Sequence, residues 1–140
     1  MAHSLELTQT APRNLARSTG AICAGLVTVA GLSTATDVLL HATGVFPEYG
    51  HAMSSGLFVL ASAYRSAFAV LGGYVCARIA ARKPVTHALV LGTLGLLASL
   101  AGLAATIGRG PEFGPLWYPV LLALTAVPCS WLGAAAFKSA

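Results

Sequence analysis

Apolar residues occupy four long blocks of the chain, and charged residues lie almost entirely between these blocks. Three of the blocks contain no charged residue, and the fourth, residues 56–77, contains one, Arg65. A run of around 20 apolar residues is long enough to cross a hydrocarbon core of about 30 Å as a helix. The pattern therefore predicts four membrane helices, at residues 19–41, 55–78, 85–108 and 116–137.

The apolar runs are continuous rather than alternating, which favours helices over membrane strands. Segments 41–51 and 108–115 are rich in Gly and Pro and are predicted to be turns, and residues 81–84 form a short connection. We expect an all-α membrane protein whose four transmembrane helices form a compact antiparallel up-and-down bundle. Residues 19–138 would form this single transmembrane domain, preceded by a cytoplasmic tail, residues 1–18, that is frayed or lies at the interface.

Composition narrows the class of protein. Only 9% of the 140 residues are charged and 56% are hydrophobic, whereas an average soluble domain has about 25% charged residues. A soluble globular enzyme would lack the polar residues to cover its surface, and a disordered chain requires low hydrophobicity and high net charge. The chain is thus predicted to be solvated mainly by lipid.

The basic residues predict an orientation. Six of them fall on one side of the predicted bundle: Arg13, Arg17, Arg78, Arg82, Lys83 and Lys138. The opposite loops contain Glu48, Arg109 and Glu112. Because cytoplasmic loops are enriched in Lys and Arg, both termini are expected in the cytoplasm and the chain in a bacterial inner membrane. The net charge of +4 then indicates contact with anionic membrane lipids rather than with nucleic acid.

The N-terminus also allows a second interpretation. Two arginines, the apolar run 21–32 and the small residues Ser33 to Ala35 resemble a cleavable signal peptide. Apolar residues resume at positions 38–40, however, and give the segment full membrane length. This length favours a retained first helix.

Small residues recur at helical spacing in every predicted span. The third helix has the longest series. In the order of the four predicted helices, the stripes are Ala24, Thr28, Gly31 and Ala35; Ala61, Ala69, Gly72 and Cys76; Gly92, Gly95, Ser99, Gly102 and Thr106; and Ala123, Ala126, Ser130 and Gly133. Helices in lipid associate through close packing, which small residues allow. The stripes are expected to be the packing faces of the bundle.

Two charged residues, Asp37 and Arg65, fall inside predicted spans, whereas Arg78 stands at the last position of the second span. A charge near the middle of a membrane helix costs about 2.5–3.5 kcal/mol on insertion scales and needs a partner or water. We predict an Asp37–Arg65 ion pair, with Tyr64 adding a hydrogen bond and Ser33, Asp37 and His41 forming a polar strip. The pair either fixes the packing of two helices or belongs to a proton- or ligand-sensitive site.

No cofactor or metal site is expected. His41, His51 and Glu48 lie near one another in sequence but without a ligand-spacing motif, and no Cys-x-x-Cys occurs among the three cysteines. No catalytic constellation or phosphate-binding loop is found, so the chain is predicted not to be an enzyme. Trp117 and Tyr118 are expected to anchor the fourth helix at the membrane interface or to form a docking surface.

Several segments resemble a known group of proteins. These are Thr36-Asp-Val-Leu-Leu-His41 with Gly44-Val-Phe-Pro47, Ala63-Tyr-Arg65 with Gly72-Gly-Tyr74 and Ala77-Arg78, His87-Ala88 with Leu91-Gly92, and Gly114-Pro-Leu-Trp-Tyr-Pro119. From about Thr36 onward the chain resembles an uncharacterised family of small four-helix bacterial inner-membrane proteins. The resemblance implies the four-helix fold and the inner-membrane location, and no known activity. The size is similar to that of small multidrug-resistance exporters, but their membrane-embedded Glu in the first helix is missing.

Two functions are compatible with these observations. The first is a non-enzymatic accessory or self-associating membrane module, which would form a homo-oligomer or join a larger membrane complex. The alternative is a small transporter or channel that uses Asp37, His41 and Arg65 as its polar path. Because four tightly packed helices leave little room for a pore, such a transporter would be oligomeric.

Overall fold

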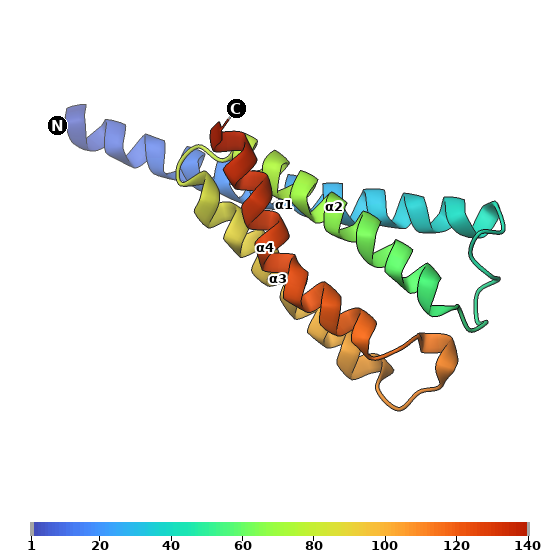
Figure 1. Cartoon of the computed structure of the whole chain (residues 1–140). Coiled ribbons are helices and arrows are strands. Elements are labelled where there is room, and N and C mark those ends of the chain that lie inside the picture. Colours follow the sequence, from blue (N-terminus) through green and yellow to red (C-terminus); the bar gives the residue numbers. More distant parts are fainter. Residues whose placement is uncertain (1, 140) are drawn as a thin grey trace.

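The computed structural model describes residues 2–139, with side chains described from residue 14 onward. Four long helices, α1 (Ala2–Ala42), α2 (Ser55–Ile79), α3 (Pro84–Thr106) and α4 (Trp117–Ser139), make up the fold, with a short 3-10 turn, η1 (Pro111–Phe113), before α4 (Figure 1). Within residues 2–139 there is no strand, and each of the four long helices contains or lies within a segment long and apolar enough to cross a membrane. The prediction of an all-helical chain with four helices of membrane-spanning length is confirmed.

The helix boundaries follow the predicted spans closely except at the start. α2, α3 and α4 begin and end within two residues of the predicted positions. α1 begins at Ala2 rather than at residue 19, so residues 2–18 continue the helix instead of forming a separate frayed tail. Hydropathy marks where a helix can enter lipid, and it carries no information on whether the helix continues into water.

The helices alternate in direction, and their connections define two ends of the bundle. Both termini and the short connection between α2 and α3 lie at one end, here called the termini end (Figure 1). The connections 43–54 and 107–116 lie at the other, the loop end. Around the bundle, α1 packs along α2, α2 along α4, and α4 along α3, whereas α1 and α3 touch only sparsely.

Glycines bring the helix backbones together toward the termini end. A Cβ at Gly133 would lie 2.5 Å from the backbone nitrogen of Tyr74, and one at Gly73 would lie 2.8 Å from the Cα of Ser130. A Cβ at Gly92 would lie 2.8 Å from the Cα of Val127. These distances are too short for any side chain, so α4 contacts α2 and α3 backbone to backbone, as the small-residue stripes predict.

The helices separate toward the loop end. A Cβ at Gly31 of α1 or at Gly102 of α3 would meet nothing within 4 Å. The buried residues of α3 are Ala88, Leu91 and Gly92, all in its first half. The predicted packing stripe of α3 is therefore used only in part, and the bundle is compact at the termini end and open between α1 and α3 at the loop end.

The packing face of α1 differs from the predicted stripe. Ala21, Gly25 and Ser33 are the buried side, whereas Gly31 and Ala35 are exposed. The observed face is one residue further around the helix, a rotation of about 100°. Both faces of α1 carry small residues at helical spacing, so the spacing alone cannot choose between them, and Asp37 lies on the face that the structure uses.

The loop end of α2 is attached to the start of α4. Phe58 is only 7% exposed, and its ring lies 5.0 Å from that of Tyr118 and 6.5 Å from that of Trp117. Gly114 has φ 85°, and a Cβ there would lie 2.5 Å from the Phe58 ring. Glycine is thus required at this position both by its backbone conformation and by the aromatic contact. α2 and α4 stay together at both ends of the bundle.

Candidate functional site: the Arg65 hollow

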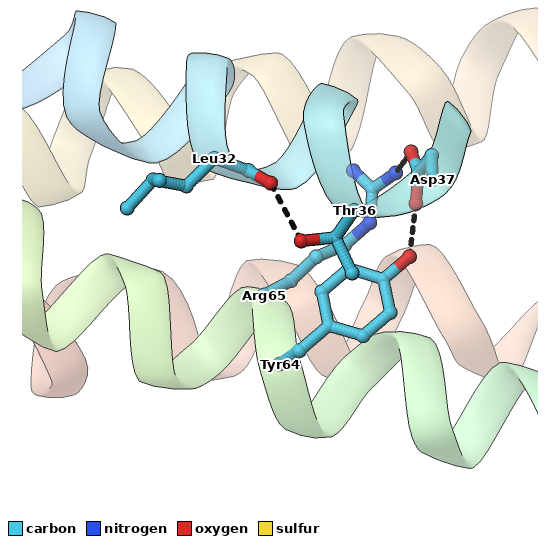
Figure 2. Close-up of polar contacts among 5 residues, drawn as sticks. All are labelled: Leu32, Thr36, Asp37, Tyr64 and Arg65. Carbon is cyan, nitrogen blue, oxygen red and sulfur yellow. Dashed lines mark hydrogen bonds and ion pairs between the residues drawn. The ribbon is translucent and has the colours of Figure 1, made fainter. Parts of the chain in front are cut away.

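Asp37, Tyr64 and Arg65 form a polar cluster between α1 and α2 (Figure 2). The Nη2 of Arg65 donates to Oδ2 of Asp37, and the Tyr64 hydroxyl donates to Oδ1 of the same carboxylate. The structure therefore contains the predicted ion pair and the additional hydrogen bond from Tyr64. Both oxygens of Asp37 are engaged, which compensates the negative charge on two sides.

The local sequence explains why these side chains meet. Asp37 lies one turn beyond the buried Ser33 on α1, so these two side chains share one side of the helix. A Cβ at Gly25 would lie 3.0 Å from the carbonyl oxygen of Gly72. The absence of a side chain at Gly25 therefore lets α1 lie close to α2. Three turns further along, this close approach leaves the two charged side chains within reach of each other.

A hollow of about 200 Å³ lies beside Arg65, between the four helices. Its walls are mainly apolar, with Arg65 and several hydroxyl-bearing residues as the polar elements. The lining residues are Leu26, Val29, Ser33, Arg65, Ser66, Ala69, Leu91, Gly92, Gly95, Ala98, Ser99, Leu122, Thr125, Ala126 and Ser130. We call this space the central hollow. It exists because α1 and α3 diverge where the glycine contacts end.

A second hollow, of about 290 Å³, lies between Arg65 and the loop end. We call it the outer hollow, and it is lined by Arg65, Ala98, Ser99, Gly102, Thr106, Phe113, Tyr118, Pro119 and Leu122. Four residues line both spaces: Arg65, Ala98, Ser99 and Leu122. The two hollows therefore adjoin at Arg65, which is the one charged residue in the walls of either among the residues that the structure describes.

The Arg65 side chain has more donors than the cluster satisfies. Its Nε is buried and has no hydrogen-bond partner among the described residues. The side chain as a whole is 33% exposed, against 26% for Asp37. A buried donor without a partner is uncommon in native proteins and costs about 1–3 kcal/mol, more when the group is charged. The Arg65 guanidinium thus keeps hydrogen-bonding capacity beyond the cluster, although Nε itself is not accessible from the hollows as they stand.

The other members of the predicted strip take different positions. Ser33 is 5% exposed and lines the central hollow, close to the cluster. His41 is committed to the first loop: its Nδ1 lies 2.7 Å from the carbonyl oxygen of Pro47, and its ring stacks on Tyr49 at 3.9 Å between centroids. The structure therefore places Ser33 with Tyr64, Asp37 and Arg65, and uses His41 to order the loop.

The two aromatic residues at the start of α4, Trp117 and Tyr118, lie in different surroundings. Trp117 is 38% exposed at the loop end, a position that suits an interface anchor. Tyr118 lines the outer hollow and packs against Phe58. Among the described residues, no three His, Cys, Asp or Glu side chains gather as metal ligands, and this includes the trio His41, Glu48 and His51.

Several residues of the predicted packing stripes line the hollows instead. Ser99, Gly102 and Thr106 belong to the predicted packing stripe of α3, but they line the outer hollow. The hydroxyl groups within that stripe are the one signal that could have indicated a solvent- or ligand-facing surface. Phe58, which ties α2 to α4, carries no such signal in the sequence.

Comparisons of the chain with protein-family models, with curated proteins and with solved structures find no match. The function is therefore argued from the site alone.

Proposed function

We propose that the protein is a multi-pass protein of a bacterial inner membrane with both termini in the cytoplasm. The orientation rests on the basic residues, because Arg17, Arg78, Lys83 and Lys138 all lie near the termini end. Arg17 also donates from Nε to the carbonyl oxygen of Ile79 at 2.8 Å. This bond caps the last turn of α2 with a cation, as the helix dipole favours.

Within this membrane, the protein acts as a small transporter or solute-binding protein that admits a small molecule from the loop end. One observation carries the proposal: the outer and central hollows adjoin at Arg65, so together they extend from the loop end to the middle of the bundle. The glycine contacts close the bundle toward the termini end. This arrangement supports a binding site that is reached from one side of the membrane, with a charged residue where the two hollows meet.

Cysteine labelling tests the access route and the orientation together. In a chain whose three cysteines are replaced by alanine, we expect a membrane-impermeant maleimide added outside to label Ser99→Cys in the hollow and Glu112→Cys in the loop. Lys138→Cys should react only after the membrane is opened. A chain that keeps only Cys76, which is fully buried, is the matched unreactive control.

Two outcomes would contradict the proposal. Labelling of Lys138→Cys from outside would overturn the orientation. Protection of Ser99→Cys in a membrane where Glu112→Cys reacts would show that water does not enter the hollow from the loop end.

Self-association is the second candidate function, and the open edge of the bundle favours it. Gly31 on α1 and Gly102 on α3 face no neighbour within 4 Å, although small residues in membrane helices commonly allow a second helix to approach. We expect the protein to be oligomeric in mild detergent and Gly31→Leu to shift it to the monomer. Gly20→Leu, at an equally open glycine near the termini end, should leave the mass unchanged. A monomeric wild-type chain would contradict this candidate.

A further inference from the structure

Arg65 lines both hollows, and its contact with Asp37 uses only part of its hydrogen-bonding capacity. A guanidinium group has five N–H bonds arranged in a planar fork. The contact with Asp37 is made through Nη2 only, and Nε is buried without a partner among the described residues. Because a carboxylate commonly binds an arginine through two parallel N–H bonds, a second carboxylate would satisfy Arg65 better than Asp37 alone does.

The walls of the hollows define the rest of such a ligand. Apart from Arg65 they contain no charged residue among those described, and large parts of the central hollow are formed by Leu26, Val29, Leu91 and Leu122. Its volume of about 200 Å³ is below the range of about 300–1,000 Å³ that is usual for drug-sized ligands. The walls therefore fit a small molecule with one anionic end and an apolar body.

We propose that Arg65 binds a small amphipathic carboxylate in these hollows, and that Asp37 leaves Arg65 and takes up one proton when the ligand binds. The inference rests on the proposed function, because the ligand must reach Arg65 from the loop end.

The charges around the pair explain the proton. The charged and titratable groups that face it are Asp37 on α1, Tyr64 and Arg65 on α2, and Tyr118 on α4. α3 presents neutral side chains at this level, such as Ser99. Two carboxylates cannot share one guanidinium at low dielectric without a cost, and a phenol ordinarily titrates near pH 10. Asp37 is the carboxylate of the cluster, and the proposal assigns the incoming proton to it.

The exchange balances in both charge and hydrogen bonds. One ligand anion and one proton enter together, so the net charge of the bundle does not change. The ligand carboxylate takes the Arg65 donors that Asp37 releases, and the new proton resides on a carboxyl oxygen of Asp37. The Tyr64 hydroxyl can remain bound to Asp37 in either state, because a phenol both donates and accepts (Figure 2). Binding is thus electroneutral.

Benzoate is a suitable probe, with benzylammonium and benzyl alcohol as a cation and a neutral molecule of similar shape. We expect purified protein in mild detergent to bind benzoate saturably and neither of the other two. Proton uptake, measured by calorimetry in two buffers of different ionisation enthalpy, should approach one proton per benzoate. The dissociation constant for benzoate should then rise about tenfold per pH unit, by linkage, over the pH range in which binding takes up one proton.

Variants separate the two parts of the inference. Asp37→Asn should still bind benzoate, without proton uptake and without the pH dependence. Arg65→Gln should lose benzoate binding, and the Asp37→Asn/Arg65→Gln chain, which has no unpaired charge, should lose it as well if Arg65→Gln alone fails to fold. Arg82→Gln, at an exposed arginine in the connection between α2 and α3, is the matched control and should bind as the wild type does.

The contradicting results are distinct. Benzoate binding without proton uptake in the wild type would overturn the exchange, and so would loss of binding in a folded Asp37→Asn chain. Failure of the wild type to bind benzoate while Ser99→Cys is labelled from outside would overturn the carboxylate inference and leave the proposed function intact. Failure of both experiments would overturn the proposed function itself.

Discussion

Replacing Asp37 with alanine will lower the free energy of unfolding by about 2 kcal/mol. The substitution leaves the Arg65 guanidinium without its carboxylate and removes the acceptor of the Tyr64 hydroxyl. Breaking a fully buried ion pair by removing one partner costs about 3–5 kcal/mol, and the expected loss is smaller because the Arg65 side chain is 33% exposed. Tryptophan fluorescence during unfolding in mild detergent measures the change.

A second substitution shows whether the unpaired charge is the cause. In the Asp37→Ala/Arg65→Met chain no charge is left in the cluster, so most of the lost stability should return. Glu112→Ala removes a carboxylate that is exposed at the loop end and should change stability by less than about 0.5 kcal/mol. An Asp37→Ala chain as stable as the wild type would show that the ion pair does not hold α1 against α2.

The largest effect is expected at Gly133, where alanine will destabilise the protein by about 3 kcal/mol. The added methyl group would overlap the carbonyl oxygen of Val70 and lie 2.5 Å from the backbone nitrogen of Tyr74. Backbone atoms cannot turn aside as a flexible side chain can, so α2 and α4 must move apart. Thermal unfolding in mild detergent and the yield of folded protein are the measurements.

Gly102→Ala is the matched control for this prediction. It makes the same chemical change in a helix of the same type, at a glycine with nothing within 4 Å of the added methyl group. Alanine favours a helix over glycine by about 1 kcal/mol, so this variant should be as stable as the wild type or more so. Equal losses at Gly102 and Gly133 would mean that the α2–α4 contact does not depend on close approach of the backbones.

The four spans could be predicted because the bilayer fixes the length of an apolar helix. How the helices face one another could not be predicted in the same way. In a soluble protein the apolar face of a helix identifies the core, but in lipid both faces are apolar, so hydrophobicity does not separate packed from exposed positions. The rotation of α1 and its separation from α3 depend on which glycines contact another helix. Gly25 makes such a contact and Gly31 does not, although both belong to series of small residues with similar spacing.

The ion pair was predictable for a different reason. Asp37 and Arg65 are the two charged residues inside the ends of the predicted spans, and neither can be left uncompensated there. The hollow beside them depends on the divergence of two helices that are distant in sequence. Its residues are small or apolar, and in the sequence they cannot be distinguished from a packing face.

The attachment of α2 to α4 at two separate points makes this helix pair the fixed part of the bundle. The aromatic contact at Phe58 lies toward the loop end of this pair, and the glycine contact at Gly73 lies toward its termini end. α1 and α3 lie on the two sides of this pair, and they approach each other where Gly25 lies next to the Leu91 side chain. A change in the width between α1 and α3 at the loop end would therefore leave the α2–α4 contacts at Phe58 and Gly73 unchanged.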